Sequence, residues 1–182
     1  MNVGHWVALR HAIETKRDTE KVAWESELTK ALGRAATAGF CATYEKFRIK
    51  KRNSAIEIEP RGGVTMPATK ADVPAIALTR LPNIDDPKLA FRVALRRDGR
   101  IEQYTMSLVG TEKSTGLPWY VRIDLDEAQK GQGPCGHPLL HAHVGGDPSN
   151  KQAQPVRLPL PWLAPHHALE WILANVAGFE PG

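Results

Sequence analysis

The residues of this sequence that are best suited to chemistry are concentrated in one short segment, Gly136–His143. Two of them, His141 and His143, alternate with apolar residues. On a β-strand, alternate side chains point to the same face, so the two imidazoles are expected side by side. Their points of attachment to the backbone are then about 6–7 Å apart. That spacing lets the pair share one phosphate or one metal ion. The alternating apolar residues are then expected to face the core: Leu140, Ala142 and Val144.

Two neighbouring imidazoles suit metal-free acid–base cleavage of a phosphodiester. RNA supplies its own nucleophile, the 2′-hydroxyl, and cleavage requires one group to take its proton and another to protonate the leaving oxygen. Histidine serves both roles because its unperturbed pKa is about 6.5. Cations on neighbouring segments would stabilise the charge on the phosphoryl oxygens, and Arg96 and Arg157 are further candidates for this role. The predicted catalytic set comprises two histidines and two arginines: His141, His143, Arg122 and Arg92.

A zinc site is the alternative use of the same segment. A cysteine and three histidines follow one another with the spacing Cys-x-His-x3-His-x-His: Cys135, His137, His141 and His143. Thiolate and imidazole are the ligands that zinc prefers. Asp147, or the pair His166 and His167, can complete such a site. Acid–base catalysis by the histidine pair, in contrast, requires no cofactor. A third interpretation is structural: the histidine pair lies on a solvated strand face and has no catalytic or binding role.

Several other catalytic patterns do not occur in the sequence. It contains no phosphate-binding loop, no dinucleotide-binding glycine motif, no HExxH, no CxxC and no GxSxG. The acidic groups at Asp85-Asp86 and at Asp124, Asp126 and Glu127 are interpreted as turn and loop-edge residues rather than magnesium ligands. Cys41 follows Phe40 in an apolar neighbourhood, so a place in the core is expected for its thiol.

Alternation of apolar and polar residues predicts an antiparallel sheet. The segment Leu89–Arg96 alternates, and Asp98-Gly99 supplies the residue types of a two-residue hairpin turn. Further strands are predicted at residues 55–59, 75–81, 101–109, 119–125, 139–144 and 156–160. The last of these is an edge strand, because Pro159 cannot donate a hydrogen bond to a central ladder.

Helices are predicted at both ends of the chain. Residues 3 to about 37 repeat apolar side chains at helical spacing, and Gly39 is a plausible stop. Pro165–Val176 has proline at its first position, an apolar stripe and Gly178 beyond its end. The predicted fold class is therefore α+β: an N-terminal helical arm, an antiparallel β-sheet and a C-terminal amphipathic helix packed on the sheet. The expected division is an arm over residues 1–52 and a sheet domain over residues 53–182.

A basic segment ends the predicted arm. Five of the seven residues from 46 to 52 are cationic: Lys46, Arg48, Lys50, Lys51 and Arg52. Closely spaced cations of this kind contact phosphates, which makes the segment a candidate nucleic-acid contact. A solvated linker or sheet edge is the alternative.

Composition limits the class of protein. The chain has 182 residues, a formal charge of +4 and two cysteines, which permits nucleic-acid binding and gives no disulfide framework. An apolar run long enough to cross a membrane does not occur, and the first residues lack a signal-peptide core. A cytoplasmic location without membrane contact is expected.

Residues from about 88 to 177 resemble the TumE type of small bacterial toxin. The resemblance rests on an H-x-H-type strand, a proline-containing loop and a closing helix at Ala168–Val176. The matching positions are Gly136, His137, His141, Ala142, His143, Gly145, Pro159 and Pro161. It implies a growth-inhibiting protein that acts on RNA through His141 and His143 and is neutralised by a protein partner.

Taken together, these patterns predict an RNA-acting protein of a toxin–antitoxin or defence system. A protein partner is expected on the N-terminal helices, where apolar residues recur along one stripe: Trp6, Leu9, Ile13 and Trp24. RNA is the expected substrate. The alternatives are a non-enzymatic assembly subunit that binds nucleic acid through residues 46–52, and a zinc-dependent hydrolase or zinc-binding module.

Overall fold

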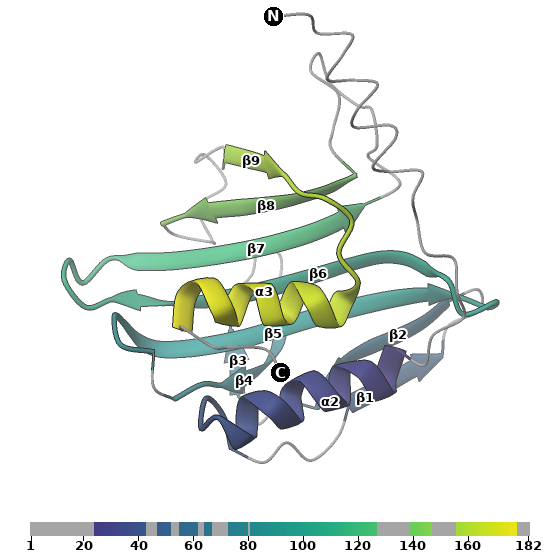
Figure 1. The fold of residues 1–182 in the computed structure, drawn as a ribbon, viewed down its shortest axis with the longest axis horizontal. Helices are drawn as coiled ribbons and strands as arrows, with labels where there is room; N and C mark the ends of the chain where they lie inside the picture. Colours follow the sequence, from purple (N-terminus) through teal and green to yellow (C-terminus); the bar gives the residue numbers. More distant parts are fainter. Residues whose placement is uncertain are drawn as a thin grey trace, which may run out of the picture.

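A nine-stranded antiparallel sheet carries two helices on one of its faces (Figure 1). The structure is a computed structural model and describes residues 24–42, 47–51, 55–61, 64–66, 73–79, 81–126, 139–146 and 156–177. The elements within these ranges are α2 (Trp24–Thr37), β1 (Phe47–Lys51), β2 (Ala55–Pro60), β3 (Val64–Met66), β4 (Val73–Ala77), β5 (Ile84–Arg96), β6 (Ile101–Glu112), β7 (Pro118–Asp126), β8 (Leu140–Gly145), β9 (Val156–Pro159) and α3 (Pro165–Ala177). The predicted α+β class, with a closing helix on an antiparallel sheet, is confirmed.

The strand order is β1-β2-β5-β6-β7-β8-β9, and the short β3–β4 hairpin joins the sheet through β5. The long strand β5 has two neighbours on one edge: β2 pairs with its C-terminal half and β4 with its N-terminal half. From β5 to β9, each strand pairs with the next in sequence. The strand β9 forms the edge predicted from Pro159.

The β5–β6 hairpin confirms the predicted pair of strands but not the predicted turn. The loop has three residues, Arg97–Gly99, rather than two. The Gly99 amide donates to the Arg96 carbonyl, and the Arg96 amide donates to the Arg100 carbonyl. The φ of Gly99 is 84°, a left-handed conformation that glycine adopts without a steric penalty. This is the common three-residue loop, a turn followed by a left-handed glycine, and it suits the twist of the strands.

The helix α2 ends where the sequence predicts. Gly39 has a φ of 80°, and the amides of Gly39 and Phe40 donate back to the last-turn carbonyls of Ala36 and Ala35. This arrangement is a Schellman motif. Trp24, which the sequence places on a partner-docking stripe, is instead buried, and its indole Nε1 donates to the Gly99 carbonyl at 3.1 Å.

The helix α3 begins at Pro165, as predicted, and packs on α2 and on β6. Its buried side is apolar: Ala168, Leu169, Ile172 and Leu173 are each 0% exposed. Two polar contacts fix its position. Glu170 accepts hydrogen bonds from the Arg34 guanidinium of α2. The Tyr104 hydroxyl of β6 donates to the Leu163 carbonyl at 2.8 Å, just before the helix.

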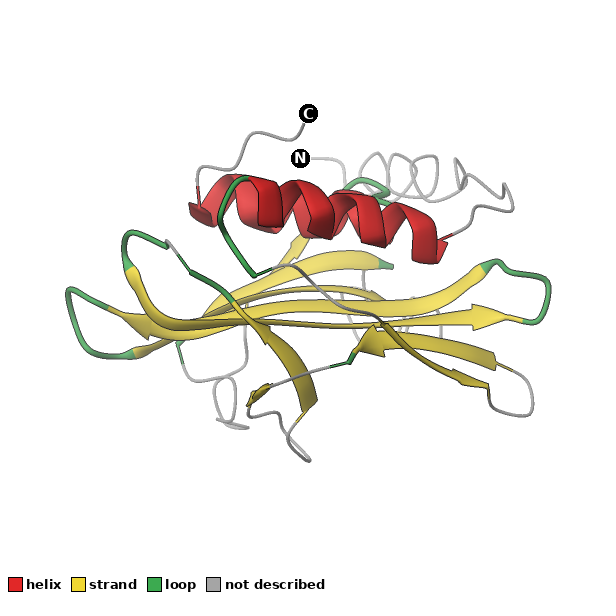
Figure 2. Ribbon diagram, turned by 90° about the horizontal axis from the view of Figure 1, so that it is seen from below, coloured by secondary structure: helices red, strands yellow, loops and turns green. Residues whose placement is uncertain are grey.

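The two faces of the sheet differ in chemistry. The helical layer covers one face (Figure 2), where buried residues from every strand between β5 and β8 form the main core, among them Val93, Met106, Ile123 and Ala142. No helix of the described ranges lies on the other face. That face has a small apolar cluster at one end, formed by Met66, Ala75, Ala90, Val109 and Tyr120, and polar side chains beyond it.

The strand β8 follows this division with one exception. Leu140 and Ala142 are buried in the main core, as the alternation predicts. Val144 points to the same face but is 44% exposed, because α3 lies over β6 in the middle of the sheet and leaves the β8–β9 end less covered (Figure 1).

The N-terminal part of the predicted arm, residues 1–23, lies outside the described residues. Within the described part, α2 contributes to the same core as the sheet, and β1 pairs along its whole length with β2. The predicted boundary between residues 52 and 53 stays a prediction. None of the described helices is both long and apolar enough to cross a membrane.

Candidate active site

The register of three strands brings the candidate site together. Asp124 of β7 lies opposite His141 of β8, and Arg122 lies opposite His143. On the other side of β7, Thr105 of β6 lies opposite Asp124. These positions alternate with core residues, so all five side chains lie on the face of the sheet that the helices do not cover.

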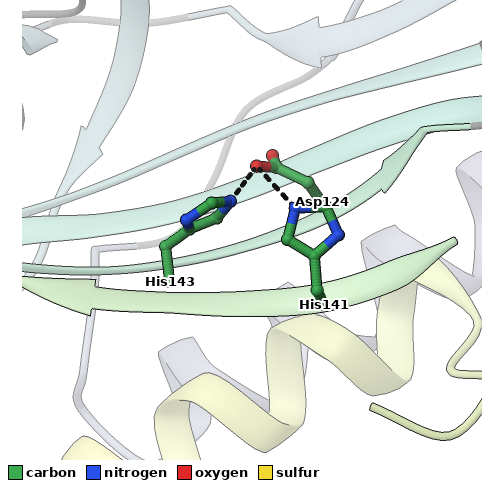
Figure 3. Close-up of side chains that lie close together, drawn as sticks. All are labelled: Asp124, His141 and His143. Atoms are coloured by element: carbon green, nitrogen blue, oxygen red, sulfur yellow. Dashed lines mark ion pairs between the residues drawn. The ribbon is translucent and has the colours of Figure 1, made fainter. Parts of the chain in front are cut away.

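Three of these side chains meet at one carboxylate oxygen. The Nε2 of His143 lies 3.2 Å from Asp124 Oδ2, and the Nε2 of His141 lies 3.9 Å from the same atom (Figure 3). The Nε of Arg122 donates to this oxygen at 2.7 Å. The two imidazoles meet edge to face, with ring centroids 4.6 Å apart. The predicted histidine pair is therefore adjacent in space, and a carboxylate holds it from the neighbouring strand.

The histidine pair is buried, which contradicts the interpretation of a pair on a solvated strand face. His141 is 1% exposed and His143 is 2% exposed. The Nδ1 of His143 is buried and has no hydrogen-bond partner among the described residues. A buried polar nitrogen is costly to leave without a partner, so such atoms concentrate where a ligand or a reaction uses them.

The carboxyl group of Asp124 is ionised in this environment. Burial by itself would raise its pKa. The hydrogen bond from His143, the charges of Arg122 and His143 and a hydrogen bond from Thr105 outweigh burial, and the pKa of Asp124 lies below its ordinary value. The site therefore contains a fixed negative charge that orients at least one imidazole.

A pocket of about 420 Å³ opens over this cluster. Its lining includes both histidines and three arginines from three strands: Arg92 of β5, Arg122 of β7 and Arg157 of β9. Among the described residues of the lining, Asp124 is the only carboxylate, and it faces three arginines. The predicted phosphate-facing residues Arg92 and Arg122 lie in this lining, and so does Arg157, whereas Arg96 does not.

The sequence interpretation missed Asp124. Asp124 was expected at a loop edge, but it lies inside β7 with its side chain in the site. The alternation of Trp119–Leu125 places Tyr120, Arg122 and Asp124 on one face. Alternation within one strand does not give its register with a neighbouring strand. The register of β7 with β8 is needed to place Asp124 beside the histidines.

The other predicted ligands lie either outside the described residues or on the opposite face of the sheet. Cys135, His137 and Asp147 lie outside the described residues. His166 and His167 lie on α3, on the opposite face of the sheet, where the His166 ring packs 6.3 Å from that of Trp24.

The basic segment is only partly described. Arg48, Lys50 and Lys51 belong to the edge strand β1, and their side chains are not described. Lys46 and Arg52 lie outside the described residues. Nucleic-acid contact through this segment stays a prediction.

The arrangement also has the composition of a metal-binding group. Asp124, His141 and His143 each offer one ligand atom, and these atoms lie within 4.8 Å of one another. Two histidines and one carboxylate bind zinc in hydrolases and iron in oxygenases. If a metal binds here, Asp124 is a ligand that the sequence pattern did not predict.

Comparisons with known proteins add no identification. No protein-family model matches the chain, and no curated protein or solved structure is significantly similar to it. The resemblance of residues 88–177 to TumE-type toxins stays a prediction.

Proposed function

We propose that this protein is a metal-independent ribonuclease whose active site is the pocket around His141, His143 and Asp124. The observation that carries the proposal is the pair of adjacent imidazoles held by one ionised carboxylate in a pocket lined by arginines. Imidazoles supply proton transfer near neutral pH, the carboxylate orients them, and the arginines attract a phosphodiester. RNA is the favoured substrate because its 2′-hydroxyl is the nucleophile, so the protein need only move protons.

The reaction follows from these roles. One imidazole accepts the proton of the 2′-hydroxyl as its oxygen attacks phosphorus, and the other gives a proton to the departing 5′-oxygen. The P–O5′ bond breaks, leaving a 2′,3′-cyclic phosphate and a 5′-hydroxyl. Asp124 stabilises the imidazolium that His143 forms, and Arg92, Arg122 and Arg157 stabilise the phosphoryl oxygens.

The test is cleavage of labelled single-stranded RNA in the presence of a chelator. We expect products with a 2′,3′-cyclic phosphate end, and no cleavage when the nucleotide at the cleaved bond carries a 2′-deoxy sugar. His143→Ala and His141→Ala should each lower the rate by about 10²–10⁴-fold. His167→Ala, an exposed histidine on α3, is the matched control and should retain full activity. Absence of RNA cleavage by the wild type, or full activity of His143→Ala, would contradict the proposal.

A metal site is the second candidate, favoured by the convergence of two Nε2 atoms and one carboxylate oxygen. The contact of Arg122 with the same oxygen weighs against it, because a guanidinium and a metal ion on one carboxylate oxygen repel each other. Metal content of tag-free protein purified without a chelator separates the two. About one zinc per chain, lost in Asp124→Asn, would establish the metal site; metal-free protein that cleaves RNA would exclude it.

The biological setting that we propose is a toxin or defence protein. Expression of the wild type should then arrest growth of the host cell, and His143→Ala should relieve the arrest at equal protein level. A neutralising partner on the N-terminal residues Trp6, Leu9 and Ile13 belongs to the same proposal, and a truncation that removes residues 1–20 would test it by loss of partner binding.

A further inference from the structure

A second pocket adjoins the histidine pocket on the same face of the sheet. It has a volume of about 290 Å³. Arg92, Thr105 and Arg122 line both pockets, so the two form one groove that runs across β7, β6 and β5 towards β2. We call the second pocket, beside β3 and β4, the inner pocket.

The inner pocket combines apolar walls with one buried carboxylate. The apolar part of its lining comes from five residues: Met66, Val73, Pro74, Ala90 and Phe91. The carboxylate is that of Glu59 in β2, a residue that is only 2% exposed. Arg92, which is half exposed, approaches it, with Nη2 3.9 Å from Glu59 Oε2. A flat apolar group with hydrogen-bonding atoms along one edge matches this lining.

We propose that the inner pocket is a nucleobase subsite that selects guanine. The proposal rests on the proposed ribonuclease activity and names the nucleotide that the groove recognises. Bases that leave the stack are bound between apolar side chains and identified by hydrogen bonds to their Watson–Crick edge. Met66 and Pro74 supply the apolar contacts, and Glu59 and Arg92 supply the polar ones.

The polarity of the two side chains is what selects guanine. An ionised carboxylate only accepts hydrogen bonds, and a guanidinium only donates them. The guanine edge presents two adjacent donors, N1–H and the N2 amino group, followed by the O6 acceptor. Adenine and cytosine each present an acceptor beside their amino donor, and uracil has one donor between two acceptors. Only guanine gives Glu59 two donors and places an acceptor beside them for Arg92.

The layout of the groove fits one nucleotide. Ile58 of β2 pairs with Val93 of β5, and the next residues along the two strands are Glu59 and Arg92, whose side chains approach each other. Arg92 pairs with Thr105, which pairs with Asp124. Three strand spacings of about 4.8 Å place the backbone of Glu59 roughly 14 Å from that of Asp124, measured across the sheet. Arg92, Thr105 and Arg122 line both pockets along this path. A base in the inner pocket therefore leaves its phosphate near Arg122 and the histidines.

The test is calorimetric binding of 3′-monophosphates to the full chain. Guanosine monophosphate should bind about tenfold to a hundredfold more tightly than adenosine, cytidine or uridine monophosphate. Inosine monophosphate, which lacks the N2 amino group, should bind with intermediate affinity. Glu59→Gln replaces an acceptor by a donor and should abolish the preference while binding of inorganic phosphate is kept. Glu57→Gln, on the same strand and outside both pocket linings, should keep the preference.

The outcomes separate this proposal from the proposed function. Equal affinity for all four nucleotides, or an unchanged preference in Glu59→Gln, would overturn guanine selection, while histidine-dependent RNA cleavage would still support the ribonuclease. Guanine preference without any RNA cleavage would support the subsite as a binding site and overturn the ribonuclease. Mapping of the cleaved bonds tests the subsite independently: guanine selection requires cleavage next to guanosine in the wild type and loss of that bias in Glu59→Gln.

Discussion

Asp124→Asn is the perturbation that tests the architecture of the site most directly. The wild-type carboxylate accepts a hydrogen bond from Arg122 at 2.7 Å, lies 3.2 Å from the Nε2 of His143 and is bonded by Thr105. Asparagine has almost the same shape but only one acceptor oxygen. Its amino group is itself a donor and cannot accept the hydrogen bonds that Arg122, His143 and Thr105 give to the wild-type carboxylate. Hydrogen bonds to charged groups contribute about 1.5–3 kcal/mol each. A third of the Arg122 side chain is exposed, which lowers the contribution of its hydrogen bond to stability. We therefore expect the substitution to lower the free energy of unfolding by about 2–3 kcal/mol at neutral pH.

The pH dependence of this difference adds a second measurement. The pKa of Asp124 is lowered in the folded protein, so its ionised form stabilises the fold at pH values above the unfolded-state pKa of about 3.9. The stabilisation should be lost as the pH falls through the lower, folded-state pKa. The difference in stability between wild type and Asp124→Asn should therefore be constant near neutral pH and shrink in acid.

The assay is urea denaturation followed by circular dichroism, from neutral pH down to the onset of acid unfolding. Asp98→Asn is the matched control, because Asp98 bonds Arg100 at an exposed hairpin loop, where asparagine is also well tolerated. Its unfolding midpoint should stay close to that of the wild type. An Asp124→Asn variant within about 0.5 kcal/mol of the wild type would refute the view that this carboxylate holds the site together.

Three further predictions concern the frame that carries the site. Leu169→Ala, at a fully buried position of α3, should lower the free energy of unfolding by about 2–5 kcal/mol in urea denaturation, whereas Val144→Thr at an exposed strand position should have little effect. Gly99→Val should destabilise the β5–β6 hairpin by about 1–2 kcal/mol, because a β-branched residue is strained at a φ of 84°; thermal unfolding would measure it. A double-mutant cycle of Arg34→Ala and Glu170→Gln should give a coupling of about 1 kcal/mol between α2 and α3, and additive effects would show that the ion pair does not couple the helices.

Much of the fold could be predicted from local patterns. Pro165 and Gly39 marked a helix start and a helix end because both residues have strong backbone preferences. Local patterns located β5–β9, with the largest error at the start of β5, which was predicted at Leu89 and lies at Ile84. The hairpin loop at Asp98-Gly99 was located but assigned the wrong length, because the same two residue types suit both two-residue and three-residue loops.

Local sequence patterns were sufficient to assign which side chains share a face of each strand. Period-two alternation in Leu140–Val144 put His141 with His143, because successive residues of a strand point to opposite faces. The alternation in Trp119–Leu125 likewise puts Arg122 and Asp124 on one face, although Asp124 was interpreted as a loop-edge residue. The residue types then restricted the chemistry to proton transfer, metal binding or anion binding. None of this required knowledge of distant contacts, which is why the histidine pair could be predicted.

The surroundings of that pair depend on contacts between strands that are distant in the sequence. The register of β7 against β8 put Asp124 opposite His141, and β5 and β9 added Arg92 and Arg157 to the pocket. Packing of the apolar face against α2 and α3 fixes these contacts. A shift of one residue would turn each strand over, so the buried core that selects the register also assembles the polar site on the other face.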